Sequence, residues 1–472
     1  MNDRLWSPDE LSATLGAPHG KLSTAVRGVS IDTRTLQPGD LFFAIKGDAS
    51  DGHDFVDRAF AAGAAAVVVE KGKAEALAGQ GAVYPVDHTL PAMERLGVAA
   101  RRRTQARIAA VTGSVGKTSA KEMLRVVLGK AGPAHAAAAS YNNHWGVPLT
   151  LARMPASASF GVFEIGMNHA GEITPLVALV RPHAALVTTI APVHIEYLGS
   201  LQAIAEAKAE IFTGIEPDGV AVINRDAPHF ELLKERALTL GARVATFGAD
   251  EQADARLLHF EHSGQGSRIE ARIEGRDVVF ALGAPGLHMA QNALGVMLVA
   301  RALGVDIAAS ADALAEFSPA KGRGERMILS AKDGPFTLID ESYNANPASM
   351  RAALDLLGAT LPGVGGRRIA ALGDMLELGA QGAAMHAALA DDLKRNRVDL
   401  LFCAGPLMQG LFDAAPIAMR GASGAKSADI QSSLFDEIHA GDVVMVKGSN
   451  GSRMGPVVAA LKSNFSGDAS AA

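Results

Sequence analysis

The chain has 472 residues, of which 48% are hydrophobic and 20% are charged, so it can bury several large cores and is not disordered. Lys plus Arg number 44 against 50 Asp plus Glu, and this net charge of −6 argues against non-specific nucleic-acid binding as the main activity. At roughly 150 residues per domain, the length suggests about three domains.

Cysteine content and apolar runs favour the cytoplasm. The single cysteine, Cys403, excludes an internal disulfide and a cysteine-rich zinc site, as is usual in a reducing compartment. The N-terminal segment MNDRLWSPDELSATLG has no apolar signal-peptide core. Runs such as residues 60–69 are much shorter than the roughly 20 apolar residues that span a bilayer. We therefore expect a cytoplasmic α/β enzyme with no membrane span.

Residues 1–105 are predicted to form a small α/β domain. The expected elements are short strands at 26–34, 40–45 and 64–70 and helices at 54–64 and 93–105. The last helix ends in Arg101, Arg102 and Arg103, which we interpret as a solvated helix end. A new apolar strand begins at Arg107, so the boundary is placed near residue 105.

Residues 106–316 are predicted to form a central, doubly wound domain with a mostly parallel sheet. The expected strands are the apolar runs that begin at 107, 160, 184 and 219. Such continuous runs suit parallel strands that helices cover on both faces. The stretch 255–282 alternates differently and predicts a small antiparallel hairpin set.

Residues 317–472 are predicted to form a C-terminal, Rossmann-like α/β domain. Strands are expected at 337–341, 367–373, 400–405 and 442–448, with helices between them. The last seven residues, SGDASAA, are expected to form a frayed tail.

A glycine-bearing loop after the strand from Arg107 gives the strongest chemical signal. A helix follows this loop, whose residues are Gly113, Ser114, Val115, Gly116, Lys117, Thr118 and Ser119. Its backbone N–H groups can surround phosphate oxygens, while the lysine reaches the β and γ phosphates and the threonine binds Mg²⁺. Val111 replaces the first glycine of the common G-x-x-x-x-G-K-[ST] motif, so the match is to the shorter G-x-x-G-K-T. We therefore predict a nucleoside triphosphate site.

Two further polar residues follow buried strands near this loop. Glu164 ends the strand from 160, and we interpret it as a Mg²⁺ ligand because a buried carboxylate is costly unless it is paired or bound to metal. His194 follows the strand from 184, and a lone histidine in such a place is more often structural. A phosphate-binding loop alone is compatible with a motor, a kinase, a GTPase switch or a ligase.

Several motifs together resemble the Mur ligases, the ATP-dependent amide-bond ligases of peptidoglycan synthesis. The resemblance covers nearly the whole chain and rests on TGSVGKTSAKEML, YNNHWGVPLTL (141–151), FEIGMNHAGEI (163–173), TTIAPVHIEYLGS (188–200), AKAEIF (207–212), GLHMAQNAL (286–294), GRGERM (322–327), DESYNANPASM (340–350) and LGDMLELG (372–379). SYNANP, GDMLELG and YNNHWGVPLT are similar to the family member that adds D-alanyl-D-alanine to UDP-N-acetylmuramoyl-tripeptide. This resemblance implies an ADP-forming ligase that makes a carbon–nitrogen bond through an acyl phosphate, with roles in cell-wall synthesis, cell shape and cell division.

The resemblance also implies roles in ATP and Mg²⁺ binding. Lys117 and Arg323 would bracket the γ-phosphate. Thr118 and Glu164 would bind one Mg²⁺, and His194 would bind a second.

The resemblance implies an unusual role for Lys208, which would be carbamylated. An ammonium cannot ligate Mg²⁺ because it has no lone pair, whereas a carbamate is an anion like a carboxylate. By its local sequence alone, Lys208 would be a solvated lysine between Glu206 and Glu210. The family pattern also assigns Asn292 to the adenine and Glu341 to the ribose hydroxyls, although many relatives have aspartate at the latter position.

The resemblance implies substrate contacts in all three domains. The candidates are Ser30, Arg34 and Lys46 for the uridine diphosphate end, Asn142, Asn143 and His144 for the activated peptide end, and Asn344, Asn346 and Lys447–Ser449 near the acceptor amine. The expected partners are UDP-N-acetylmuramoyl-tripeptide and D-alanyl-D-alanine, and we expect a monomer. Since one substrate would bridge separate domains, we expect the linkers near 105 and 317 to allow closure.

Three alternative functions remain open. A folylpolyglutamate synthase shares the acyl-phosphate chemistry but lacks an N-terminal UDP domain of this kind. A ligase that adds diaminopimelate or lysine belongs to the same pathway, although SYNANP and LGDMLELG favour the D-alanyl-D-alanine enzyme. A nucleotide-gated binding protein would hydrolyse ATP or GTP without needing both co-substrates.

Overall fold

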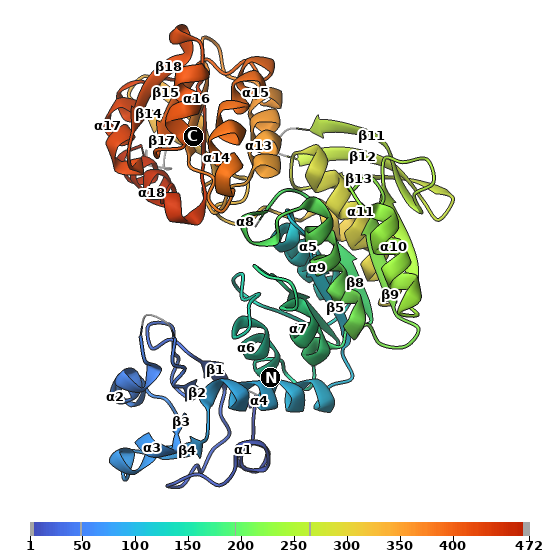
Figure 1. Cartoon of the computed structure of the whole chain (residues 1–472), viewed down its shortest axis with the longest axis vertical. Coiled ribbons are helices and arrows are strands. Elements are labelled where there is room, and N and C mark those ends of the chain that lie inside the picture. The colour runs from blue at the N-terminus through green and yellow to red at the C-terminus, as the bar shows by residue number, and fades with distance from the viewer. Residues whose placement is uncertain (1–3, 48–49, 194, 264–265, 466–472) are drawn as a thin grey trace.

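The computed structural model describes residues 4–47, 50–193, 195–263 and 266–465. Within these residues the chain forms three sheets, each in its own lobe. The N-terminal, central and C-terminal lobes follow one another along the longest axis of the molecule, from blue through green to red (Figure 1). No helix in the described ranges is long and apolar enough to cross a membrane.

The N-terminal lobe is built on a parallel sheet in the order β1-β2-β3-β4. Its elements are α1 (Pro8–Leu15), β1 (Gly28–Ser30), β2 (Asp40–Phe43), α2 (Val56–Ala61), β3 (Ala66–Glu70), α3 (Lys71–Ala74), β4 (Ala82–Val86) and α4 (Thr89–Arg103). The strand expected over 26–34 has only three residues, because the carbonyl of Asp32 accepts the N–H groups of Thr35 and Leu36 and starts a turn.

The central lobe contains a sheet in the order β13-β12-β11-β10-β9-β8-β5-β7-β6. Its elements are β5 (Arg107–Thr112), α5 (Lys117–Ala131), β6 (Ala134–Ala136), α6 (Gly146–Ala152), β7 (Phe160–Glu164), α7 (Ile173–Val180), β8 (Ala184–Val187), α8 (Ile195–Leu198), α9 (Leu201–Ala209), β9 (Val220–Asn224), α10 (Phe230–Thr239), β10 (Arg243–Gly248), β11 (Ala255–Ser263), β12 (Gly266–Ile273), β13 (Arg276–Leu282), α11 (Leu287–Ala302) and α12 (Ile307–Ala315). Strands from β6 to β11 pair in parallel, whereas β12 is antiparallel to both of its neighbours, which confirms the expected hairpin set.

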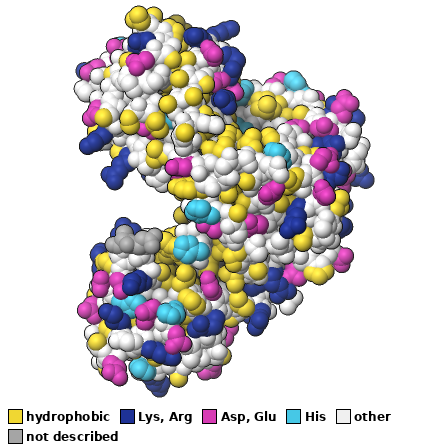
Figure 2. Space-filling view, in the orientation of Figure 1, with side chains coloured by type: hydrophobic (Ala, Val, Ile, Leu, Met, Phe, Trp, Pro, Cys, Tyr) yellow, Lys and Arg dark blue, Asp and Glu magenta, His cyan; other side chains and the backbone are white. Residues whose placement is uncertain are grey.

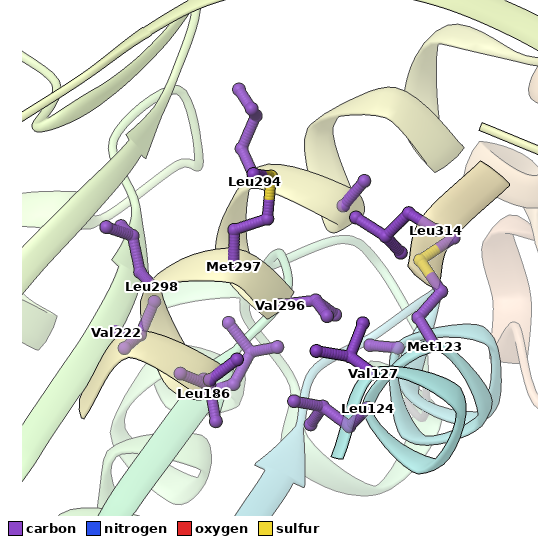
Figure 3. Close-up of a cluster of buried hydrophobic side chains, with 14 of the residues drawn as sticks. Met123, Leu124, Val127, Leu186, Val222, Leu294, Val296, Met297, Leu298 and Leu314 are labelled. Carbon is purple, nitrogen blue, oxygen red and sulfur yellow. The ribbon is translucent and has the colours of Figure 1, made fainter. Parts of the chain in front are cut away.

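Helices cover both faces of the central sheet, so alternate residues of its strands enter two different cores. Ala109 and Val111 of β5 belong to the core under α5, α11 and α12, whereas Ile108 and Ala110 belong to the core under α7, α9 and α10. In the first core, Leu186 and Val222 of the sheet meet side chains from all three helices, among them those labelled in Figure 3. This burial on both faces explains the continuous apolar runs in the sequence.

The C-terminal lobe contains a sheet in the order β14-β15-β19-β16-β17-β18, parallel except for the β14–β15 pair. Its elements are β14 (Glu325–Ala331), β15 (Gly334–Glu341), α13 (Pro347–Ala359), β16 (Arg368–Gly373), α14 (Gly382–Ala387), α15 (Leu389–Arg395), β17 (Leu400–Ala404), α16 (Met408–Ala414), β18 (Arg420–Gly424), α17 (Gln431–Asp436), β19 (Val443–Lys447) and α18 (Gly455–Asn464). The sequence did not predict β14, whose residues are mostly half-buried at the sheet edge. The carboxyl ends of β15, β16 and β19 are neighbours, which places their loops together.

The N-terminal lobe shares a hydrophobic core with helix α6 of the central lobe. Leu149 and Ala152 of α6 are buried in the same cluster as Trp6 and Leu11. The Trp6 indole donates a hydrogen bond to the Ala152 carbonyl (2.8 Å). Arg153 donates to the Val29 carbonyl of β1 (2.6 Å). These two lobes are therefore packed as one body on this side.

The interpretation of Arg101 and Arg103 as a solvated helix end is wrong. Arg101 is 8% exposed, and its guanidinium donates to the carbonyls of Val180 (2.8 Å) and Arg181 (2.9 Å) at the end of α7. Arg103 lies over the Trp6 ring, 3.4 Å from its centroid. The Arg101 guanidinium thus satisfies buried carbonyls, and the Arg103 guanidinium stacks on an indole and pairs with Glu10 (3.0 Å), which a sequence run of arginines does not reveal. Only Arg102 of the three is exposed.

Replacing Trp6 should destabilise the junction between the N-terminal and central lobes. We expect Trp6→Ala to lower the free energy of unfolding by about 3–5 kcal/mol, because it opens a cavity and leaves the Ala152 carbonyl unpaired. Urea unfolding followed by circular dichroism measures the change. Trp145→Ala is the control, since Trp145 is 38% exposed and its loss should cost less than about 0.5 kcal/mol. Equal midpoints for the two variants would contradict the shared core.

Candidate active site

A tight loop joins β5 to α5 and can only be built with glycine at two positions. Gly113 and Gly116 have φ angles of 145° and 85°, a region that other residues rarely adopt. A Cβ atom at Gly113 would collide with the Thr188 hydroxyl, and one at Gly116 would collide with the Asn292 amide. Gly116 is the N-cap of α5, so the unpaired N–H groups at the start of this helix face the loop.

Lys117 is held over this loop as a partly dehydrated cation. Its ammonium donates to the Gly113 carbonyl (2.7 Å). Burial lowers the pKa of Lys117, the carboxylate of Glu164 partly offsets this, and the positive charge of Arg323 adds to it. An anion that enters the loop therefore meets a cation with little competing hydration.

Glu164 lies at the carboxyl end of β7 and is 3% exposed. One carboxylate oxygen accepts a hydrogen bond from the Thr118 hydroxyl (2.8 Å), and the other accepts one from the Asn142 amide (2.7 Å). Both donors are neutral, so the contacts hold the carboxylate in place without neutralising it.

The oxygens of Thr118 and Glu164 suit a magnesium ion. Mg²⁺ in nucleotide enzymes is usually held by one or two carboxylates together with waters and substrate phosphates. Across the described part of the chain, no three His, Cys, Asp or Glu side chains form a group that could hold a metal by themselves. A site made from Thr118, Glu164 and phosphate oxygens fits this chemistry. His194, the expected ligand of a second Mg²⁺, lies outside the described residues.

Lys208 is buried on helix α9, with 1% of its surface exposed, so the alternative of a solvated lysine is wrong. Glu206 instead accepts a hydrogen bond from Gln202, and Glu210 accepts N–H groups at the start of α7. Burial and the repulsion of the nearby Lys117 hold the pKa of Lys208 well below its usual value. The Lys208 amine is therefore far less basic than an ordinary lysine.

A cavity of about 340 Å³ lies between the phosphate-binding loop and the C-terminal lobe. Residues that line it from the central lobe include Ser114 to Ser119, Ser140, Asn142, Glu164 and His288; those from beyond residue 320 include Arg323, Glu341, Tyr343, Asn344, Asn346, Lys447 and Asn450. Figure 2 shows the larger hollow that separates the N-terminal and C-terminal lobes. A volume of this size is typical of a small-molecule site.

Lys447 and Ser449 bind the loops of the C-terminal lobe to one another. Lys447 is 2% exposed and donates to the Glu341 carboxylate (3.2 Å) and to the Asn344 carbonyl (3.0 Å). The Ser449 hydroxyl donates to the Ala345 carbonyl (3.1 Å) and accepts a hydrogen bond from a backbone N–H of the loop after β16. Glu341, the expected ribose ligand, is therefore also paired with a lysine.

Some of the other residues predicted in these two lobes line the cavity, and others only hold the nearby backbone in place. Asn142 and Asn344 line the cavity, while Asn143 accepts the Gly146 N–H at the start of α6 (2.9 Å). Asn346 lines the cavity too, although its side chain caps α13 by accepting the Ser349 N–H. His144 does not line the cavity; its ring stands edge-on to that of Trp145. Asn292 is 6% exposed and packs against Gly116.

The three uridine diphosphate candidates lie in the N-terminal lobe, away from the cavity. Ser30 is 1% exposed, and its hydroxyl donates to the Asp32 carbonyl within its own turn. Arg34 forms a forked contact with the Asp32 carboxylate, yet its side chain is 77% exposed. Lys46 pairs with Asp51 in an isolated backbone bridge. Arg34 and Lys46 thus keep their charged groups on the lobe surface.

The cavity lining also includes residues that were not predicted from the sequence, among them Ser140, His288, Tyr343 and Asn450. Each lies in or beside a motif that was quoted, but nothing in those strings shows that they meet. Burial lowers the pKa of His288, with Glu341 raising and Lys447 lowering it from across the lobe boundary. Their convergence is a consequence of how the lobes pack.

This arrangement is that of an α/β nucleotide-binding enzyme of several lobes. A glycine loop lies at a helix start, a buried carboxylate lies beside it, and cations from two lobes surround one cavity. Three family models match in order: "Mur ligase family, catalytic domain" over 25–110, "Mur ligase middle domain" over 111–300, and "Mur ligase, glutamate ligase domain" over 324–450.

Full-length relatives agree with these models. The chain is 33% identical over 451 residues to the UDP-N-acetylmuramoyl-tripeptide–D-alanyl-D-alanine ligase of Bacillus subtilis (strain 168), covering 95% of each chain. It is 34% identical over 448 residues to the enzyme of the same name from Escherichia coli (strain K12), covering 92% of this chain and 94% of the other. The chain therefore belongs to the Mur ligase family, which confirms the resemblance seen in its motifs. A crystal structure of MurF from Acinetobacter baumannii has a TM-score of 0.84 at 28% identity, covering 97% of this chain and 99% of that one.

Proposed function

We propose that this protein is an ATP-dependent, ADP-forming ligase that joins D-alanyl-D-alanine to UDP-N-acetylmuramoyl-tripeptide in peptidoglycan synthesis. Its full-length relatives in Bacillus subtilis and Escherichia coli bear the name of that activity. The observation that carries the proposal is the cavity, in which Lys117 of the central lobe faces Arg323 and Lys447 from beyond residue 320. A ligase of this kind has to bring its substrates together from separate parts of the fold.

The cations of the cavity reduce the repulsion between the negatively charged groups that have to react. The substrate carboxylate must approach a γ-phosphoryl group, and both are negatively charged. Lys117 and Arg323 stabilise the charge on the transferring group, while Thr118 and Glu164 would hold Mg²⁺. Bound there, the ion would supply positive charge to the phosphate oxygens.

The C-terminal side of the cavity is assigned to the acceptor. The amine of D-alanyl-D-alanine attacks the acyl phosphate, an amide bond forms and inorganic phosphate leaves. Asn344 and Asn346 offer polar groups there, and Lys447 fixes the Asn344 backbone. Enclosure matters because water would otherwise hydrolyse the acyl phosphate.

Lys208 is assigned a carbamate. Its neutral amine adds to the carbon of CO₂, a carbon–nitrogen bond forms and one proton is released. The depressed pKa of Lys208 favours this reaction, because only the neutral amine has the lone pair that attacks. The product is an anion beside Lys117, so a neutral amine is replaced by a group that attracts the Lys117 ammonium.

The remaining assignments concern the whole chain. The lobes correspond to a UDP-substrate domain over 1–105, an ATP-binding domain over 106–316 and a dipeptide-binding domain over 317–472. Ser30, Arg34 and Lys46 are assigned to the uridine diphosphate end, with Asn292 near the adenine and Glu341 near the ribose. We assign a cytoplasmic, monomeric enzyme that needs Mg²⁺.

Substrate-dependent phosphate release tests the proposal. With ATP, Mg²⁺, UDP-N-acetylmuramoyl-tripeptide and D-alanyl-D-alanine, we expect steady release of phosphate together with ADP and a longer UDP-linked peptide, detected by mass spectrometry. Leaving out any one component should reduce phosphate release to near background. Without ATP, Mg²⁺ or the UDP-linked tripeptide no acyl phosphate forms, and without the dipeptide the acyl phosphate is not turned over.

The same assay separates the alternatives. Replacing the dipeptide by diaminopimelate or lysine, with the corresponding UDP-dipeptide, tests the other ligase of the pathway. A folate substrate with glutamate tests a folylpolyglutamate synthase. Rapid hydrolysis of ATP or GTP without either co-substrate would instead identify a nucleotide-gated binding protein and contradict the ligase assignment.

A further inference from the structure

A chain of hydrogen bonds crosses the cavity from a cation to an anion. A guanidinium nitrogen of Arg323 is 3.3 Å from the Ser140 hydroxyl oxygen, which is 3.2 Å from the Thr118 hydroxyl. Thr118 donates in turn to Glu164 (2.8 Å). Since a guanidinium can only donate and a carboxylate can only accept, the direction of every bond is fixed: Ser140 accepts from Arg323 and donates to Thr118.

Ser140 is held firmly to the central lobe. It lies in the loop between β6 and α6, and Lys121 of helix α5 donates to the Ala137 carbonyl at the start of this loop (2.8 Å). Lys121 is fully buried, with 0% exposed. Two residues after Ser140, the Asn142 amide donates to Glu164. The loop therefore moves with the phosphate-binding helix.

Arg323 is held just as firmly to the C-terminal lobe. Its guanidinium lies over the Tyr343 ring, 4.1 Å from the centroid. The Tyr343 N–H donates to the Gly322 carbonyl (3.1 Å), and the Gly322 N–H donates to the Asp340 carboxylate (3.2 Å). The bond between Arg323 and Ser140 thus joins two separately anchored bodies.

We propose that Ser140 is a positioning residue that sets the place of Arg323 relative to the phosphate-binding loop. Its hydroxyl fixes the guanidinium one hydrogen-bond step from Thr118, where the phosphate end of a nucleoside triphosphate would lie. This inference rests on the proposed use of ATP. It predicts that Ser140 acts through Arg323, so the effects of replacing the two residues are not independent.

A double-mutant cycle on ATP binding tests this coupling. The affinity of Mg²⁺-ATP is measured by calorimetry for the wild type, Ser140→Ala, Arg323→Ala and the double variant. We expect Ser140→Ala to weaken binding by about tenfold, as for the loss of a hydrogen bond to a charged group. The double variant should bind within about twofold of Arg323→Ala alone, because Ser140 has no cation left to position. Ser140→Thr keeps the hydroxyl and should restore affinity to within about threefold of the wild type.

Ser267→Ala is the matched control for removing a serine hydroxyl. Ser267 is 1% exposed and donates to the Ala284 carbonyl (2.8 Å), but it does not line the cavity. Its loss should leave ATP affinity unchanged, and thermal unfolding checks that all variants are folded. The proposal is overturned if Ser140→Ala binds ATP like the wild type, or if the two fold-losses simply multiply in the double variant.

Binding and ligation are scored separately in this test. Coupling in ATP affinity without ligation of the dipeptide would support the role of Ser140 and count against the proposed function. Ligation by the wild type with no coupling between Ser140 and Arg323 would leave the proposed function standing and reject the positioning role.

Discussion

Lys117→Ala should reduce turnover by about 100- to 1,000-fold, the size seen when a preorganised group that stabilises transition-state charge is removed. The effect should be large because this ammonium sits in a half-buried loop, hydrogen-bonded to the Gly113 carbonyl, where burial already lowers its pKa and water competes less with a phosphate than in bulk solvent. Phosphate release at saturating co-substrates measures the change in kcat.

Lys130→Ala is the control for this variant. Lys130 lies near the end of the same helix, is 55% exposed and pairs with Glu316 on the surface. Its loss should leave kcat within about twofold of the wild type, since exposed ion pairs contribute little. Activity of Lys117→Ala within about threefold of the wild type would reject the assignment of the phosphate-binding loop.

Lys208→Ala should also be nearly inactive, because it removes the anion that carbamylation would place beside Lys117. Short carboxylates such as formate or acetate should restore part of the activity of this variant by occupying the space of the lost side chain. Phosphate release with increasing carboxylate concentration measures the rescue. Mass spectrometry of the native protein tests for the carbamate itself, since the added CO₂ raises the mass by about 44 Da.

Lys234→Ala is the control, since Lys234 is a half-buried lysine that pairs with Glu231 on helix α10 and does not line the cavity. It should keep full activity and gain nothing from carboxylates. An experimental structure of an active, Mg²⁺-loaded complex with an unmodified Lys208 ammonium would falsify the carbamate. A fully active Lys208→Ala variant would reject any catalytic role for this residue.

The sequence predicted the parts of the fold that depend on local pattern. Continuous apolar runs marked the parallel strands, because both faces of the central sheet are covered and every side chain of β5 from Ile108 onward is buried. The phosphate-binding loop was equally visible, since its two left-handed glycines and the helix start lie within six residues.

Contacts between distant segments could not be predicted in the same way. The run of Arg101 to Arg103 has the composition of a solvated helix end, but α7 and Trp6 pack onto it and bury two of the three side chains. Ser140 contacts Arg323 only because two lobes meet, whereas Tyr343 contacts Arg323 because two segments of the C-terminal lobe pack together. Strand β14 was missed because its half-buried residues show no continuous apolar run.

The core shared by α6 and the N-terminal lobe means that the first lobe is not a detachable module. A fragment that began at residue 107 would expose Leu149 and Ala152, and it would lose the Trp6 indole that satisfies the Ala152 carbonyl. Such a fragment should aggregate through this apolar face, even though its phosphate-binding loop is complete. Exchange of the first lobe between relatives would succeed only if helix α6 were exchanged with it. The segment that has to be kept together therefore extends past the N-terminal sheet into the central lobe.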